Sequence, residues 1–182
     1  MSIYSFKITL ASLFGNIYRG KHVLIAPIDS DNKIILGSKP KFYPPQIYRL
    51  IGGGIEGNES LETAIYREAK EELNLAIDSK KLGLPIEISF EVTCQKKNYL
   101  FITYLFIYYL SRQDVIRPGS DIAGIVKMTK PELKQLINRY YALPKDSWYK
   151  DAKTSYAHRW SDYGKVYGKI HEVLYQELMH TQ

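Results

Sequence analysis

Three consecutive glycines, followed by a helix with acidic residues on its apolar side, constrain the fold of this chain most strongly. Residues 51–75 read IGGGIEGNESLETAIYREAKEELNL. Glycine adopts backbone conformations that other residues avoid and lets a ligand approach closely, so Gly52, Gly53 and Gly54 predict a tight turn. The following residues have helical periodicity, which predicts a helix over about residues 60–73.

The predicted helix places glutamates where apolar residues are expected. When residues are placed at about 100° intervals, four apolar side chains share one arc. They are Leu61, Ile65, Ala69 and Leu73. Glu68 and Glu72 fall in line with this arc, and Glu71 lies at its edge. Like charges at these spacings cost about 0.2–0.5 kcal/mol per pair when exposed, and more when buried without partners. A hard divalent cation such as Mg²⁺ would compensate, because it prefers oxygen ligands. The alternative is a charged helix whose glutamates pair with Lys and Arg.

The same segment resembles the Nudix box, a motif of fixed spacing. The motif is a glycine, five residues, a glutamate, seven residues, and then Arg-Glu-apolar-any-Glu-Glu-any-Gly-apolar. The matching positions here are Gly53, Glu59, Arg67, Glu68, Ala69, Glu71, Glu72 and Leu75. Asn74 stands where the family has glycine. Asparagine is, after glycine, the residue that best tolerates a left-handed helix end, so the departure concerns the helix end more than the acidic residues.

The resemblance implies a fold, an activity and a cofactor. The fold would be the Nudix-type α/β/α sandwich with a mixed β-sheet. The activity would be hydrolysis of a diphosphate linkage in a nucleoside diphosphate derivative, with Mg²⁺ or Mn²⁺ as cofactor. Glu71 and Glu72 would be the principal metal ligands, and Glu68 would be a further ligand or the general base. A metal held by carboxylates would activate water and neutralise phosphoryl charge.

Further residues receive supporting roles from the same resemblance. The carbonyl group of Gly52 would coordinate the metal, and Arg67 would pair with Glu59 to orient the carboxylates. Arg49, just before the glycines, and Gly53 are candidates for contact with the substrate phosphates.

The general base is open, because some Nudix enzymes use an acidic residue outside the box. The candidates in this chain are Asp121, before a predicted strand, and Glu91, on the polar side of another. For each of them, an ordinary solvated acid is the alternative.

Other activities also remain open. An enzyme of the same fold could act on RNA 5′ ends or on an isoprenoid diphosphate. A non-catalytic module that binds a nucleotide is a third reading, although a pure binding module has no need of all three glutamates in the helix.

The remaining strands follow from apolar patterns. Residues 86–94 alternate between apolar and polar, which predicts a strand with one buried face. Residues 99–110 are apolar on both faces and predict a central strand, paired with the first through a polar turn at 95–98. Branched residues at 23–28 and 33–36 flank a turn cluster and predict two more strands.

Two helices are predicted in the last third of the chain. The first opens at Thr129 with a capping-box pattern, after a predicted strand at 122–128. The second follows Ser161 and carries a stripe of apolar and tyrosine side chains. Gly164 and Gly168 lie within this predicted helix and weaken the prediction, because glycine lowers helix stability. Strands mixed with helices in this order favour an α/β domain.

Length and cysteine content set broad limits. The chain has 182 residues, which fits one domain over residues 1–182. A single cysteine, Cys94, excludes an intrachain disulfide and favours a reducing compartment, so we expect a cytoplasmic protein. The position of Cys94 in the alternating strand predicts a buried core thiol.

Charge and hydropathy say less about partners. The net charge of +6 suits a phosphate-rich small molecule or a nucleic acid and does not separate the two. A basic surface with no special partner is an equal alternative. No apolar stretch reaches the roughly 20 residues that a membrane helix needs, so no membrane partner is expected. The resemblance also allows a homodimer.

Aromatic and basic residues mix in residues 143–160. Examples are Trp148, Trp160 and Arg159. Such a segment could bind a base by stacking or clamp RNA. The favoured alternative is that these aromatic residues pack a C-terminal helix onto the sheet.

Overall fold

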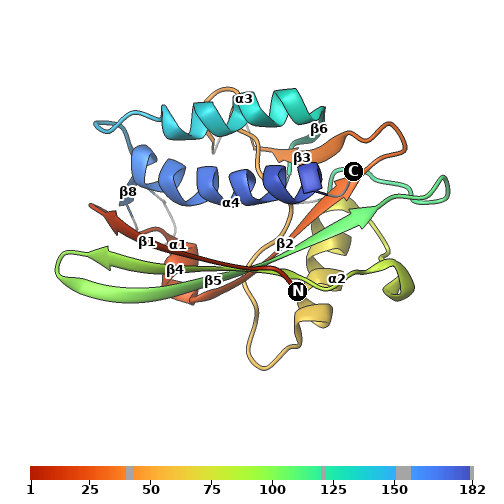
Figure 1. The fold of residues 1–182 in the computed structure, drawn as a ribbon, viewed down its shortest axis with the longest axis horizontal. Coiled ribbons are helices and arrows are strands. Elements are labelled where there is room, and N and C mark those ends of the chain that lie inside the picture. Colours follow the sequence, from red (N-terminus) through yellow and green to blue (C-terminus); the bar gives the residue numbers. More distant parts are fainter. Residues whose placement is uncertain (40–42, 120–121, 151–156, 181–182) are drawn as a thin grey trace.

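A mixed β-sheet of six strands forms the middle layer of the computed structural model, which describes residues 1–39, 43–119, 122–150 and 157–180 (Figure 1). The six strands are β1 (Ile3–Leu10), β2 (Lys21–Ile28), β3 (Ile34–Ser38), β4 (Ile86–Cys94), β5 (Lys97–Tyr109) and β6 (Gly124–Met128). Two short strands, β7 (Trp148–Lys150) and β8 (Ala157–Arg159), form a separate hairpin.

The strands are ordered β1-β4-β5-β2-β3-β6 across the sheet. The β1–β4 and β2–β5 pairs are parallel, and the other neighbours are antiparallel. The predicted mixed sheet and all the predicted strand segments are therefore confirmed. The strand expected at 122–128 begins at Gly124, where pairing with Ser38 of β3 starts.

The hairpin of β4 and β5 is tighter than the sequence suggested. Gln95 and Lys96 both have positive φ angles, of 49° and 63°. A two-residue turn of this kind matches the twist of the flanking strands. Lys97 and Asn98, expected in the turn, therefore pair with Cys94 and Thr93 and lengthen β5.

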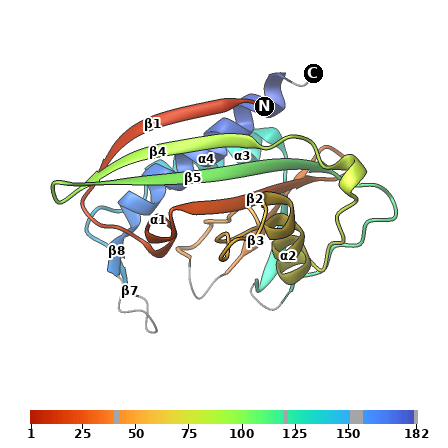
Figure 2. The same cartoon turned by 90° about the horizontal axis from the view of Figure 1, so that it is seen from below.

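Helices cover the sheet on both faces. The helices are α1 (Gly15–Arg19), α2 (Leu61–Leu73), the 3₁₀ helix η1 (Ser79–Lys81), α3 (Lys130–Tyr141) and α4 (Trp160–His180). Figures 1 and 2 show α3 and α4 on one side of the sheet and α2 on the other. This arrangement gives two hydrophobic clusters, a large one between the sheet and α4 and a smaller one between the sheet and α2. This is the three-layer α/β/α arrangement expected from the resemblance.

A capping residue fixes each end of α2. Ser60 caps the first turn, where its side chain accepts a hydrogen bond from the backbone N–H of Thr63. Asn74 ends the helix in the left-handed conformation, with φ 53° and ψ 22°. Asparagine thus replaces the family glycine at a position where a left-handed residue is needed. The capping box predicted at Thr129 is likewise present, with Glu132 as its partner.

The glycines within α4 have a packing function. A Cβ atom at Gly164 would lie 2.1 Å from the carbonyl oxygen of Tyr140, and one at Gly168 would lie 2.8 Å from the ring of Tyr141. Both contacts come from α3, so the glycines let the two helices approach closely. The low intrinsic helix propensity of glycine is outweighed here by tertiary packing.

A buried carboxylate connects β1 to α4. Asp162 is 1% exposed and accepts hydrogen bonds from the backbone N–H groups of Ala11 and Ser12, at 3.1 and 2.9 Å. The hydroxyl group of Ser12 also donates to Asp162, at 2.9 Å. These contacts hold the end of the edge strand against the first turn of α4.

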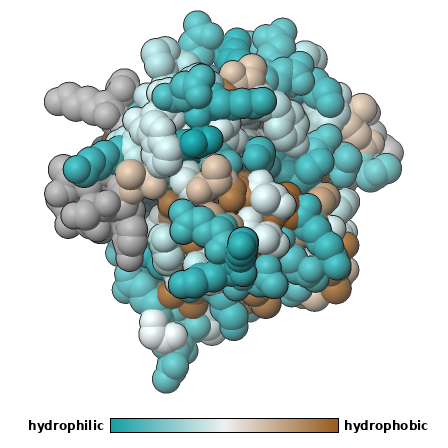
Figure 3. Space-filling model, turned by 90° about the vertical axis from the view of Figure 1, so that its left-hand side faces the viewer, coloured by the Kyte–Doolittle hydropathy of each residue, from teal (hydrophilic) through white to brown (hydrophobic). Residues whose placement is uncertain are grey.

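The surface at the end of the sheet where β4 turns into β5 is mostly hydrophilic, with hydrophobic residues in scattered patches (Figure 3). Isolated apolar residues are usual on protein surfaces. Among the helices of the described part of the chain, none combines the length and the apolar character needed to cross a bilayer.

Candidate metal and active site

The glycine turn is paired to the middle of the sheet. Val23 donates its backbone N–H to the carbonyl oxygen of Gly53 at 2.9 Å, and Ile25 donates to Ile51 at 2.8 Å. Gly52 has a φ angle of 135°, and a Cβ atom there would lie 2.1 Å from the carbonyl oxygen of Val23. Glycine is therefore required at residue 52, both by its backbone conformation and by the close approach of β2.

Glu72 points from α2 into this turn. It is 5% exposed, and its Oε2 atom accepts a hydrogen bond of 2.9 Å from the backbone N–H of Gly52. Its Oε1 atom lies 3.3 Å from the Nζ atom of Lys39, on the segment that follows β3. The carboxylate is held by backbone on one side and by a cation on the other.

Glu68 lies one helical turn earlier, against the second glycine. It is 8% exposed, and a Cβ atom at Gly53 would lie 2.4 Å from its Oε1 atom. Burial raises the pKa of Glu68 above its ordinary value, although the guanidinium of Arg67, 2.7 Å away, acts in the opposite direction. A further cation beside this carboxylate would favour its ionised form.

Arg67 and Glu59 form the expected pair. The Nη2 atom of Arg67 lies 2.7 Å from Oε1 of Glu59 and also donates to the carbonyl oxygen of Gly54 at 3.0 Å. The hydrogen bond from Arg67 lowers the pKa of Glu59. Arg67 thus links the glycine turn, the loop before α2 and the carboxylate of Glu68.

Glu71 does not join the other two glutamates in the interior. Its side chain is 55% exposed and lies 3.4 Å from Arg67. Within the described residues, no three histidine, cysteine, aspartate or glutamate side chains are grouped closely enough to hold a metal ion. The exposure of Glu71 fits its expected place at the edge of the apolar arc, because a residue between the two faces of a helix points along the edge of the contact.

The donors that are grouped still suit a hard divalent cation. Glu68 and Glu72 provide carboxylate oxygens, and the carbonyl oxygen of Gly52 lies on the turn that contacts Glu72. Mg²⁺ binds oxygen ligands and commonly keeps several waters, so it does not need a complete set of protein ligands. As the alternative reading expects, the glutamates pair with basic residues, Glu68 with Arg67 and Glu72 with Lys39. Arg67 is shared among Glu59, Glu68 and Glu71, so negative charge remains for a further cation to compensate.

Arg49 lies against the glycine turn. Its Nη2 atom donates to the carbonyl oxygen of Gly52 at 2.8 Å, and its backbone pairs with Gly37 of β3 in both directions. Its guanidinium also lies over the ring of Tyr167, 5.7 Å from the centroid. Arg49, a candidate for phosphate contact from the sequence, therefore contacts the same oxygen that the resemblance assigns to the metal.

Lys39 is a site residue that the sequence did not reveal. It lies just after β3, and no spacing rule connects it to the helix of the box. A long-range contact with Glu72, 33 residues away, is visible once β3 is placed next to the glycine turn. Gly37 and Arg49, which form a bridge, bring these two segments together.

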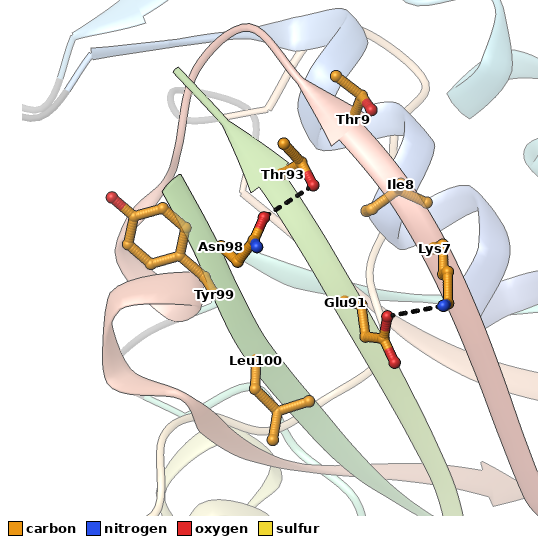
Figure 4. Close-up of a pocket in the computed structure, with 8 residues that line it drawn as sticks. All are labelled: Lys7, Ile8, Thr9, Glu91, Thr93, Asn98, Tyr99 and Leu100. Atoms are coloured by element: carbon orange, nitrogen blue, oxygen red, sulfur yellow. Dashed lines mark hydrogen bonds and ion pairs between the residues drawn. The ribbon is translucent and has the colours of Figure 1, made fainter. Parts of the chain in front are cut away.

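The two candidates for the general base have different outcomes. Asp121 lies outside the described residues. Glu91 lies on β4, where it pairs with Lys7 of β1 at 3.3 Å and lines a hollow on the open face of the sheet (Figure 4). In this view it is surrounded by residues of β1, β4 and β5, and none of the labelled residues belongs to α2.

The aromatic segment before α4 mostly packs inward. Trp160 is buried and Tyr149 contacts it with ring centroids 5.5 Å apart, which fits the favoured alternative of packing. Trp148 is 51% exposed, and the guanidinium of Arg159 lies 5.1 Å from its ring centroid. Cys94 is buried, as expected for a core thiol, and burial raises its pKa.

A comparison with models of known families finds a match, and the matched residues include the glycine turn and α2. A family model described as NUDIX domain matches residues 18–146, which is more than half of the chain. This stretch contains the glycine turn, α2 and all strands of the large sheet except β1. No curated protein matches the chain.

Solved structures of similar fold include MutT proteins. A MutT protein from Bacillus halodurans has a TM-score of 0.52 and 19% identity, and the match covers 64% of this chain and 72% of that chain. A MutT/nudix family protein from Enterococcus faecalis has a TM-score of 0.48 and 19% identity, over 59% of this chain. The match spans 42% of the Enterococcus faecalis chain. At 19% identity, the likeness to the Bacillus halodurans protein concerns the fold alone.

Proposed function

We propose, since the chain belongs to the NUDIX domain family, that it hydrolyses a diphosphate linkage in a nucleoside diphosphate derivative with Mg²⁺ or Mn²⁺ as cofactor. Members of this family are typically diphosphate hydrolases and generally depend on a divalent metal.

One observation carries the proposal. Two glutamates of α2, Glu68 and Glu72, are buried against a glycine turn instead of facing solvent. Apolar residues at these positions would have given a better core, because burial of a carboxylate is costly unless its charge is compensated. Arg67 and Lys39 compensate these charges in part, and a divalent cation held between the turn and the helix would compensate the negative charge that remains.

The proposed division of work follows from the contacts. Glu72 and Glu68 would provide metal ligands from the interior, and Glu71 would provide one from the rim, where its exposed side chain is free to reorient. Bound there, a divalent ion would supply charge neutralisation on the phosphoryl oxygens and a more acidic water. Gly52 fixes Glu72 through its N–H group, and Arg67 keeps Glu68 and Glu59 in place.

The positive charges around the turn support an anionic substrate. Lys39 and Arg49 line a closed crevice together with Glu72 and Tyr43, and the side chain of Lys39 is partly exposed. Phosphate oxygens are well matched by Arg and Lys donors.

A panel of nucleotides, dinucleotides and nucleoside diphosphate derivatives tests the proposal. The full chain is incubated with each compound and Mg²⁺ or Mn²⁺ in ¹⁸O water, and products are identified by mass spectrometry, with EDTA-treated protein as control. We expect metal-dependent release of a nucleoside monophosphate or phosphate that carries one ¹⁸O atom. Absence of turnover on every diphosphate would overturn the proposal and favour a binding module, whereas selective turnover of capped RNA or isoprenoid diphosphates would reassign the substrate class.

A further inference from the structure

Lys39 contacts the carboxylate that the proposed metal site depends on most. Its Nζ atom lies 3.3 Å from the Oε1 atom of Glu72, and its side chain is 24% exposed. The other oxygen of Glu72 is bound by the backbone of Gly52. Oε1 accepts no backbone hydrogen bond and is therefore the more available oxygen for a metal ion, and a lysine ammonium group lies against it.

A second cation stands beside it but is held differently. Arg49 donates to the carbonyl oxygen of Gly52 at 2.8 Å, pairs through its backbone with Gly37, and lies over the ring of Tyr167. These contacts fix its guanidinium within the protein. Lys39 instead reaches Glu72 with the end of a flexible, partly exposed side chain, so its ammonium group can move with little structural cost.

Lys39 and Arg49 line one closed crevice, which has no room inside it for a water molecule. The crevice is lined by Gly37, Lys39, Tyr43, Arg49, Leu50, Ile51, Glu72 and Ile122. A divalent ion on Oε1 of Glu72 and an ammonium group at the same oxygen would repel each other at short range. The metal ion and the Lys39 ammonium group therefore exclude one another on this oxygen, and the displaced ammonium group, at the end of a partly exposed side chain, needs another anion outside the crevice.

We infer that Lys39 is a tethered cation that neutralises Glu72 before the metal binds and then transfers to the substrate. When a divalent ion takes Oε1 of Glu72, the ammonium group of Lys39 leaves that oxygen and contacts an oxygen of the diphosphate. Lys39 is thus a substrate-positioning residue whose contact depends on the metal. The second half of this inference rests on the proposed function, whereas the exchange on Glu72 does not require any turnover.

Metal binding by the full chain tests the exchange. Mn²⁺ is titrated calorimetrically into metal-free wild type, the Lys39→Met variant and a Lys70→Met control, which removes the same charge from an exposed position on α2. Loss of the competing ion pair should lower the Kd for Mn²⁺ about two- to fivefold in Lys39→Met. The control should change by much less. Equal effects of the two substitutions, or no effect of Lys39→Met, would overturn the exchange; Lys39→Gln replaces Lys39→Met if the latter does not fold.

The position of the ammonium group is followed directly by NMR. Lysines are labelled by ¹³C reductive methylation, and the Lys39 signal is the one missing from Lys39→Met. We expect it to shift on addition of Mg²⁺, and to shift again when methylene diphosphonate is added. Lys39→Met should also bind methylene diphosphonate about tenfold more weakly in the presence of Mg²⁺.

The two proposals fail in distinguishable ways. A Lys39 signal that moves with Mg²⁺ in a protein that hydrolyses no diphosphate would contradict the proposed function and leave the exchange on Glu72 standing. If the protein is active but the Lys39 chemical shift does not change with Mg²⁺ or methylene diphosphonate, the present inference is overturned and the proposed function still stands.

Discussion

The helices α2 and α4 pack against opposite faces of the sheet, and both depend on glycine, but in opposite ways. At α2 the glycines belong to the facing turn, where Gly53 leaves room for the carboxylate of Glu68. At α4 the glycines belong to the helix itself, where Gly164 and Gly168 leave room for the backbone and rings of α3. The space left by glycine thus admits a charged group in one layer and an aromatic contact in the other.

This difference separates function from stability within one fold. The α4 layer holds a large hydrophobic cluster with stacked tyrosines such as Tyr163 and Tyr167, whose ring centroids are 4.3 Å apart. The α2 layer holds a smaller cluster and gives up apolar contact area to Glu68 and Glu72. We therefore expect changes in the α2 layer to affect activity first, and changes in the α4 layer to affect unfolding first.

The largest effect is expected for Glu72→Gln. The substitution keeps the size of the side chain and removes the charge that would bind the metal, so kcat should fall about a thousandfold. The melting temperature should change little. Activity is measured on the substrate found in the panel, with Glu62→Gln on the first turn of α2 as the matched control. Near wild-type kcat in Glu72→Gln would remove Glu72 from the metal site.

The next largest effect is a loss of stability of the α4 layer at low pH. Burial lowers the pKa of His158 to about 4 and that of His171 to about 4, from an ordinary value of 6.5. The unfolded chain therefore binds more protons than the folded chain between these values, and stability is lost as the pH falls from 6.5 toward 4. At pH 5 each histidine should cost about 2 kcal/mol of unfolding free energy relative to pH 7.

Urea unfolding at pH 7 and pH 5 checks this expectation. The His171→Phe variant, which cannot take up the proton, should show a smaller loss of unfolding free energy between the two pH values than the wild type. Glu68 acts in the opposite direction, because its raised pKa favours the folded state as the pH falls. If the unfolding free energy were higher at pH 5 than at pH 7, protonation of Glu68 would outweigh protonation of the two histidines, and the expectation would be wrong.

Gly164→Ala should destabilise the protein without changing its chemistry. The added Cβ atom would meet the backbone carbonyl group of Tyr140 at 2.1 Å, so α3 and α4 must separate, at a cost of about 2–3 kcal/mol. The free energy of unfolding measures this effect, and kcat at a temperature where the variant is folded should stay unchanged. Gly83→Ala, where the added atom meets nothing within 4 Å, is the control. Equal stability of both variants would refute the packing explanation.

Gly53→Ala should lower activity with little loss of stability, which is the reverse of the result expected for Gly164→Ala. The added Cβ atom would meet the end of the Glu68 side chain, which can rotate away at little cost in stability. The displaced carboxylate should lower kcat about tenfold, as loss of a supporting contact around a metal typically does. Gly124→Ala, which has open space around the new atom, serves as control. A Gly53→Ala variant with full activity would show that the position of Glu68 is not needed.

Local features of the sequence were enough to predict much of the fold. The alternation in β4, the apolar run in β5, the capping box at Thr129 and the left-handed end at Asn74 all depend on neighbours within a few residues. The pair of Arg67 and Glu59 was also expected, because the resemblance to the box motif implies it. The sequence thereby determined the strands, the helices and the identity of the carboxylate helix.

Tertiary structure decided what depends on contacts between distant segments. The approach of Lys39 to Glu72 requires β3, the glycine turn and α2 to be placed together, and the position of Arg49 over the ring of Tyr167 requires α4 to pack nearby. The glycines of α4 looked unfavourable for a helix until α3 was packed against them. Helical periodicity gives the direction of a side chain on its own element, whereas the partner it meets is set by how separate elements pack.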